Sequence, residues 1–138
     1  MRWICLLTAF ALVAGCHRGP TMAPVTGKVF YNGRPLEFGS VMFQPASGQP
    51  AQGQIQSDGT FTLSTYKEAD GAVVGRHKVR ITCYETEKPG FPRSPGEQTL
   101  GRLLIPEKYT FLDQSGLSAD VSIDREEPFV FELEGPKG

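Results

Sequence analysis

Few side chains in this sequence can serve as nucleophiles, general bases or soft metal ligands. The 138 residues contain three cysteines, Cys5, Cys16 and Cys83, and two histidines, His17 and His77. A hydrolytic nucleophile needs a base beside it, and a zinc site needs three or four converging ligands. The chain also has no G-x-S-x-G sequence, the usual setting of a hydrolase serine. We therefore expect no catalytic residue, no metal ligand and no bound cofactor.

Acidic side chains offer a second chemistry, calcium binding through hard oxygen ligands. Asp58 and Asp70 each precede a glycine, and Asp124, Glu126 and Glu127 form a short acidic run. Asp-Gly pairs are also what tight turns require, and the chain has no spaced D-x-D-x-D-G loop. The favoured interpretation is that these carboxylates are solvated at turns and strand ends, with calcium binding left open.

The N-terminus has the pattern of an exported protein. Arg2 gives a positive start, and residues 3–14 are apolar apart from Cys5 and Thr8. As a helix such a run spans about 18 Å, well short of the roughly 30 Å hydrocarbon core of a bilayer. A short apolar run behind a positive charge is typical of a secretory signal peptide.

The end of that run, "LVAGC" at residues 12–16, resembles the lipobox of bacterial lipoprotein signal peptides. The resemblance implies that the Cys16 thiol receives a diacylglyceryl group, that the chain is cut between Gly15 and Cys16, and that the new amine is acylated. Two or three acyl chains hold a protein firmly at a membrane, whereas one gives only marginal binding. The alternative is an ordinary signal cut at Ala14 or Gly15, with Cys16 incidental.

These features divide the chain into a lipoprotein signal peptide at 1–15, a lipidated Gly/Pro-containing tether at 16–24 and one folded domain at 25–138. The predicted location is the cell envelope, where acylated Cys16 would bind membrane lipid. By resemblance to the bacterial sorting pattern, His17 in place of an Asp after the lipidated cysteine leaves transfer to the outer membrane open. Cys83 is the only cysteine of the domain, so an internal disulfide is excluded.

From Val25 onward, apolar and polar residues alternate with period two, which gives each strand one buried and one wet face. Asn32-Gly33 and Asp58-Gly59 supply hairpin turns. The side chains expected to face the core are Val41, Phe43, Ile55, Phe61, Leu63, His77, Val79, Ile81, Cys83, Leu117, Ala119, Val121, Ile123, Phe129, Phe131 and Leu133. The pattern predicts an all-β fold, a single antiparallel β-sandwich of about seven strands, immunoglobulin-like in outline.

Three segments, "GKVFYNGRPLEFGSVMFQP", "GQIQSDGTFTLST" and "DGAVVGRHKVRI", resemble the carboxypeptidase regulatory-like domain. Small bacterial lipoproteins with one such domain often show an "IPEKY…SGL" segment, matched here at residues 105–109 and 115–117. The resemblance implies a transthyretin-like sandwich that is usually a non-catalytic folding, adhesion or binding module. An enzyme with this fold, 5-hydroxyisourate hydrolase, has a C-terminal "Y-R-G-S". This chain ends in "ELEGPKG", so that activity is rejected.

Two connections are longer than turns. Residues 85–105 contain Pro89, Pro92 and Pro95 at P-x-x-P spacing, which suits a stiff surface excursion or a polyproline ligand. The excursion is the favoured interpretation. Residues 106–116 carry Tyr109 and Phe111, which we expect to pack as a lid over an open end of the core rather than form a binding patch.

The net charge of −1 provides no basic stripe for phosphates, so we expect no nucleic-acid partner. The favoured function is a lipid-anchored envelope protein whose sandwich is a non-catalytic structural or protein-interaction module. The alternative is a carbohydrate-binding module at the cell surface. Its candidate aromatic platform is Phe30, Tyr66, Tyr84 and Phe91, since Trp3 leaves with the signal. An enzyme of unrecognised type is disfavoured because no catalytic constellation is recognisable.

Overall fold

The computed structural model describes Gly15 and residues 19–136. Over these residues the chain forms ten β-strands and two short 3₁₀-helices. The strands are β1 Met22–Ala23, β2 Thr26–Tyr31, β3 Arg34–Pro35, β4 Ser40–Pro45, β5 Ala51–Gln54, β6 Thr60–Thr62, β7 Ala72–Val73, β8 Gly75–Thr82, β9 Leu117–Val121 and β10 Phe129–Leu133. The helices are η1 Glu85–Glu87 and η2 Glu107–Thr110.

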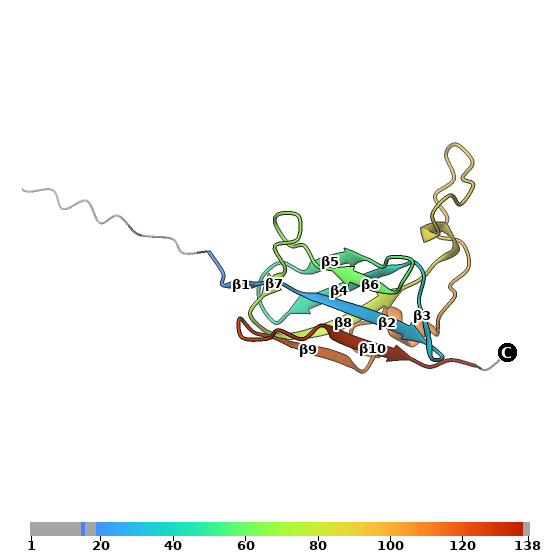
Figure 1. Ribbon diagram of the computed structural model, residues 1–138. Coiled ribbons are helices and arrows are strands. Elements are labelled where there is room, and N and C mark those ends of the chain that lie inside the picture. The colour runs from blue at the N-terminus through green and yellow to red at the C-terminus, as the bar shows by residue number, and fades with distance from the viewer. Residues whose placement is uncertain (1–14, 16–18, 137–138) are drawn as a thin grey trace, which may run out of the picture.

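Two four-stranded sheets face each other (Figure 1), which confirms the all-β sandwich. One sheet has the order β5-β4-β8-β9. In the other, β2 pairs with β10 on one side and with β6 and β3 on its opposite side. Seven of the ten strands are longer than two residues, in agreement with the expected number. The two-residue strands β1 and β7 form a separate small ladder at one end.

Side chains from both sheets fill the space between them, as the period-two alternation predicts. Phe43 on β4 lies at the centre, with ring centroids 6.3 Å from Phe61, 5.5 Å from Phe129 and 5.9 Å from Phe131. The crossing angles with Phe129 and Phe131 are close to perpendicular, the edge-to-face arrangement that aromatic rings prefer. Nearly all of the inward positions predicted from the sequence lie in this core.

Ile123 is the exception, because its side chain is 68% exposed. Strand β9 ends at Val121, and a turn follows in which the Arg125 N–H donates to the Ser122 carbonyl (3.4 Å). The alternation in the sequence continues past the point where the backbone leaves the sheet. The expectation that Ile123 faces inward is therefore wrong.

The sandwich also departs from a wholly antiparallel arrangement. Strand β10 runs parallel to β2, with Phe129 opposite Gly27 and Leu133 opposite Tyr31. The preceding strand β9 pairs with β8 in the other sheet, so residues 122–128 carry the chain across the sandwich. The direction of β10 is set by this crossing and not by a hairpin.

The Asp58-Gly59 turn is present, but it joins strands of different sheets. Strand β5 pairs with β4 and β6 pairs with β2, and the two meet at a bridge between Gln52 and Ser64. By contrast, Asn32-Gly33 closes the predicted hairpin between β2 and β3. Both residues have positive φ, 49° and 81°, as a type I′ hairpin turn requires.

Strand pairing begins before Val25, the expected start of the domain. Met22 and Ala23 form β1 and pair with Val73 and Ala72 of β7. Ala23 is 1% exposed. The last part of the predicted tether is thus built into the sandwich, and only the residues before β1 remain to connect it to Cys16.

Candidate functional site

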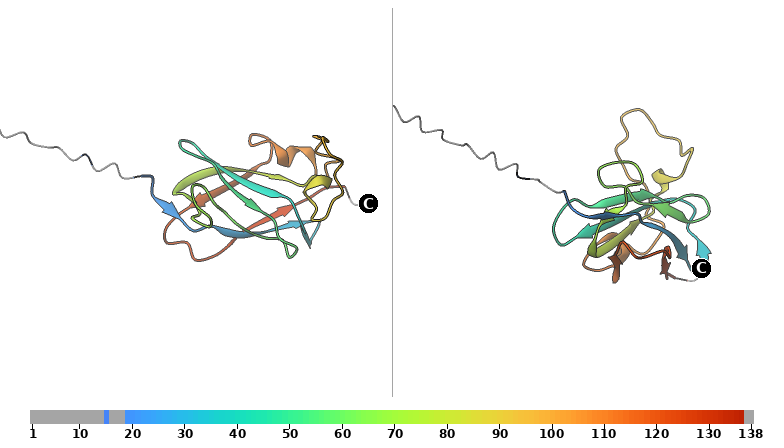
Figure 2. Two further views of the ribbon diagram at one scale, coloured as in Figure 1. Left: turned by 90° about the horizontal axis from the view of Figure 1, so that it is seen from above. Right: turned by 60° about the vertical axis from the view of Figure 1, so that its left-hand side comes forward.

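Cys16, the predicted lipidation residue, lies outside the described residues, as do Cys5 and His17. What the structure shows is where the chain enters the sandwich. The Val74 N–H donates to the Thr21 carbonyl (2.8 Å), directly beside the β1–β7 ladder. This ladder fixes the entry point at one end of the long axis, as the views in Figures 1 and 2 agree.

His77 is buried as predicted and helps to hold this ladder. Its ring is 1% exposed, and its Nε2–H donates to the Val73 carbonyl (2.6 Å). The other ring nitrogen, Nδ1, has no hydrogen-bond partner among the described residues, and the ring centroid lies 5.7 Å from that of Phe43. A histidine enclosed in this way ties β8 to β7 and has no access to a substrate in solution.

Cys83 is likewise a core residue, 1% exposed. Burial, with a smaller contribution from the negative charge of Glu87, raises the pKa of its thiol to about 12. Since the thiolate is the reactive form of cysteine, the raised pKa lowers the reactivity of Cys83 near neutral pH.

The turn carboxylates serve the backbone. Asp70 accepts hydrogen bonds from the N–H groups of Thr65 (2.7 Å), Tyr66 (3.0 Å) and Lys67 (3.0 Å), which lower its pKa. Asp58 accepts from both the hydroxyl and the N–H of Thr60, with the same effect on its pKa. Within the described residues, no three His, Cys, Asp or Glu side chains are grouped to hold a metal ion.

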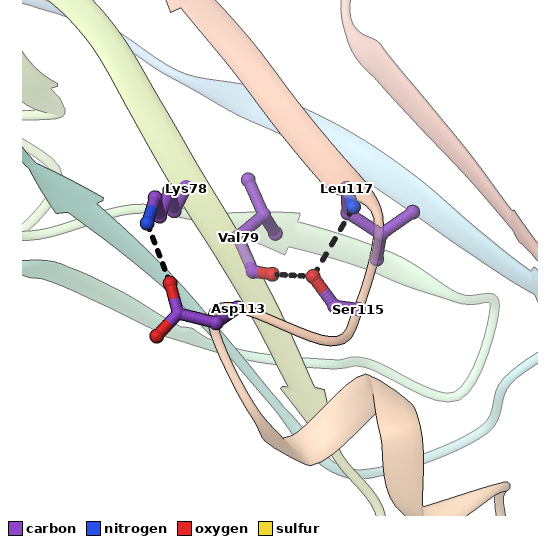
Figure 3. Close-up of polar contacts among 5 residues, drawn as sticks. All are labelled: Lys78, Val79, Asp113, Ser115 and Leu117. Atoms are coloured by element: carbon purple, nitrogen blue, oxygen red, sulfur yellow. Dashed lines mark hydrogen bonds and ion pairs between the residues drawn. The ribbon is translucent and has the colours of Figure 1, made fainter.

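The first hollow on the surface, about 550 Å³, lies at the entry end of the sandwich. Its floor is the outer face of β4, β8 and β9, and residues 112–113 form one wall. Lys78 on β8 pairs with Asp113 at 2.5 Å (Figure 3), and this contact lowers the pKa of Asp113. Because both side chains are largely exposed, the pair adds little stability.

Ser115 fixes that wall to the sheet. Its buried hydroxyl donates to the Val79 carbonyl (2.5 Å) and accepts from the Leu117 N–H (3.1 Å), as Figure 3 shows. Val79 and Leu117 are register partners in the β8–β9 ladder. The hydroxyl therefore bridges two backbone groups at the start of β9 and leads the chain from η2 into the strand.

A second hollow, about 510 Å³, lies at the opposite end of the sandwich. Half-buried Tyr31 and Phe38 line it together with the side chains of Arg34 and Glu37, and Cys83 lies against it. An aromatic surface beside a cation and an anion can contact a ring that also carries hydroxyl or amide groups.

The four aromatic residues proposed from the sequence lie on different segments and do not form one platform. Tyr84, which follows β8, is half-buried and forms a bridge with Leu103. Tyr66 is exposed in the loop before β7, whereas Phe91 is half-buried in the loop after η1. Phe30 is half-buried on β2 with the Lys28 ammonium 5.3 Å from its ring centroid. The sequence did not point to Tyr31 and Phe38 as lining residues. Tyr31 lies two residues after Val29, so the alternation predicts that it faces the core, and no local pattern shows that it is only half-buried at the end of β2.

The lid prediction for residues 106–116 is half correct. Tyr109 is 5% exposed, and its hydroxyl accepts from the Glu134 N–H (3.0 Å). Phe111 is 46% exposed, so it does not pack into the core. The loop at 85–105 projects from the sandwich (Figure 1), braced where the Thr86 hydroxyl donates to the Leu100 carbonyl (2.8 Å).

A scan against protein-family models and searches of curated proteins and of solved structures each found nothing that matches this chain. No helix among the described residues is long and apolar enough to cross a bilayer.

Proposed function

We propose that this protein is a lipid-anchored protein of the bacterial cell envelope, acylated at Cys16. Its β-sandwich would act there as a non-catalytic structural or protein-interaction module. The observation that carries this proposal is the position of the chain entry. The β1–β7 ladder holds the N-terminal segment at one end of the sandwich, and the "LVAGC" sequence stands a few residues before it.

This geometry suits an end-on anchor. A domain held at one end presents its opposite end, with the projecting 85–105 loop and the Tyr31–Phe38 hollow, away from the attachment point. The core histidine and cysteine are enclosed, and the turn aspartates bond to backbone N–H groups. These residues support a scaffold more readily than a reaction.

Membrane fractionation of the native host tests the anchor. We expect the full-length protein to sediment with membranes and to resist alkaline carbonate washing, because several acyl chains hold it. Cys16→Ser should release the domain or leave it unprocessed. Cys5→Ser is the matched control, since Cys5 leaves with the signal peptide, and it should behave as the natural protein does. Equal fractionation together with equal processing of all three proteins would contradict acylation at Cys16.

Carbohydrate binding is the second candidate, favoured by the hollow that Tyr31 and Phe38 line. Aromatic faces beside polar side chains suit sugar rings, which have apolar faces and hydroxyl edges. Affinity electrophoresis through gels containing bacterial surface polysaccharides tests it. Retardation that is lost in Phe38→Ala and kept in Phe111→Ala, an exposed aromatic elsewhere, would support it. Unchanged mobility in every gel would rule against it.

A further inference from the structure

Three loops meet around the point where the chain enters the sandwich. The loop before β7 ends at Gly71, which lies against the Ala23 carbonyl and Pro24. The β7–β8 connection is joined to the entering chain by the bond from the Val74 N–H to the Thr21 carbonyl. The loop after β9 lines a small cleft together with Pro24. This loop follows Val121, the last residue of β9, whose register partner is Gly75 in β8.

Each of these loops exposes one large apolar side chain. The exposed fractions are 56% for Tyr66, 36% for Val74 and 68% for Ile123. Single exposed apolar residues are common and need no explanation. Here, however, they come from three separate segments, each of which contacts the entering chain or lines a cleft with it.

The tether keeps this end near its attachment point. Only six Cα–Cα steps separate Cys16 from Met22, the first residue of β1. Even a fully extended chain of that length spans only about 20–22 Å. A cysteine acylated into a bilayer would therefore hold the three loops close to the lipid headgroups.

We propose that the entry end of the sandwich docks on the membrane surface, with Tyr66, Val74 and Ile123 inserted at the interface. This inference rests on the proposed acylation of Cys16. Tyrosine suits the boundary because its ring is apolar and its hydroxyl is polar. Because the tether makes the contact intramolecular, even weak insertion suffices for docking. The sandwich would then stand upright, with its hollow of Tyr31 and Phe38 facing away from the lipid.

The charges around the three exposed apolar side chains bear on which lipids favour the docking. The exposed ionisable residues there are Lys67, Glu68, Arg76, Asp124, Arg125, Glu126 and Glu127, three cations against four anions. Coulomb attraction to anionic headgroups therefore cannot drive the contact. The apolar side chains drive it, and anionic lipid weakens it.

A fluorophore placed beside Ile123 measures this contact in the acylated full-length protein. Ser122→Cys carries the reporter at the entry end, and Ser94→Cys carries it on the exposed 85–105 loop as the matched control. Native Cys83 stays unlabelled because it is buried and its thiol pKa is about 12. Both proteins are purified from host membranes and reconstituted into vesicles of phosphatidylcholine containing a nitroxide-labelled lipid.

We expect nitroxide quenching at position 122 to exceed that at position 94 by about twofold or more, since an inserted loop lies at the headgroup–acyl boundary. Adding Tyr66→Ser and Ile123→Ser to the Ser122→Cys protein should remove the excess. Replacing part of the phosphatidylcholine with phosphatidylglycerol should reduce it. Stronger quenching in phosphatidylglycerol would overturn docking through apolar side chains.

The mass of each preparation separates the two proposals. Acylated protein with equal quenching at both positions would overturn the docking and leave the anchor intact. A mature protein without acyl chains on Cys16 would overturn the anchor, and the docking with it.

Discussion

A single hydroxyl, that of Ser115, holds the start of β9 in place. It donates a hydrogen bond to the Val79 carbonyl and accepts one from the Leu117 N–H. Both backbone groups lose this partner when the hydroxyl is removed. A buried backbone group without a partner costs about 1–3 kcal/mol. We expect Ser115→Ala to lower the free energy of unfolding by about that amount, as measured by urea denaturation of the mature domain. Ser118→Ala, on the exposed face of β9, should change it by less than about 0.5 kcal/mol. Equal effects would contradict the bridging role.

Two glycines on or beside β2 are needed for different reasons. A Cβ at Gly27 would overlap the Phe61 ring and the Phe129 carbonyl, whereas a Cβ at Gly33 would meet nothing within 4 Å. Gly33 requires only a positive φ of 81°, which costs an alanine about 1–2 kcal/mol. Gly27→Ala must also push apart the two sheets or the β2–β10 pair, so its cost should exceed that of Gly33→Ala. Thermal unfolding of both variants measures this order, and the reverse order would show that the core at Phe61 is loose.

At the scale of the elements, the loop before β7 depends on one carboxylate. Three N–H groups bond to Asp70 and lower its pKa, mainly through Thr65. A lowered pKa in the folded state means that the ionised group stabilises the fold above its unfolded value of about 3.9. This contribution is lost as the pH falls through the folded pKa.

We therefore expect Asp70→Asn to be less stable than the natural protein at pH 6, with the gap closing as the pH falls below about 4. Urea midpoints from pH 6 to pH 3 measure the gap. A gap that stays constant over this range would mean that the charge of Asp70 contributes nothing to the loop.

The sequence predicts the features of a strand that depend on neighbouring residues, and it does not predict those that depend on distant segments. Apart from Ile123, alternation with period two assigns the inward faces correctly between Val41 and Leu133, because each side chain needs only its neighbours to define its side. The prediction for Ile123 is wrong because β9 ends where the chain must cross from one sheet to the other. The parallel pairing of β10 with β2 also depends on that crossing.

The candidate sites follow the same rule. Cys16 is proposed from five adjacent residues, whereas the hollow lined by Tyr31 and Phe38 exists only because residues of β2 and β3 lie beside Cys83, directly after β8. The proposed aromatic platform failed for this reason, since Tyr66 and Phe91 belong to loops at opposite ends. Residue type alone does not show which segments come together at one end of a sandwich.

At the scale of the whole molecule, the two ends of the sandwich differ in their contents. One end holds the β1–β7 ladder and the chain entry, beside the segments that carry Tyr66, Val74 and Ile123. The other holds the aromatic hollow and the projecting 85–105 loop. An anchor at the first end and recognition at the second is the arrangement that we propose.

The intact mass of the protein purified from membranes of its own host tests the anchor most directly. The proposal predicts a chain that begins at Cys16 and carries a diacylglyceryl group with a further acyl chain, and it predicts that Cys16→Ser abolishes both the modification and the cleavage. An unmodified mature chain that behaves as a freely soluble protein would contradict the anchor. The domain would then be a secreted module, with carbohydrate binding at the Tyr31–Phe38 hollow as the first function to test.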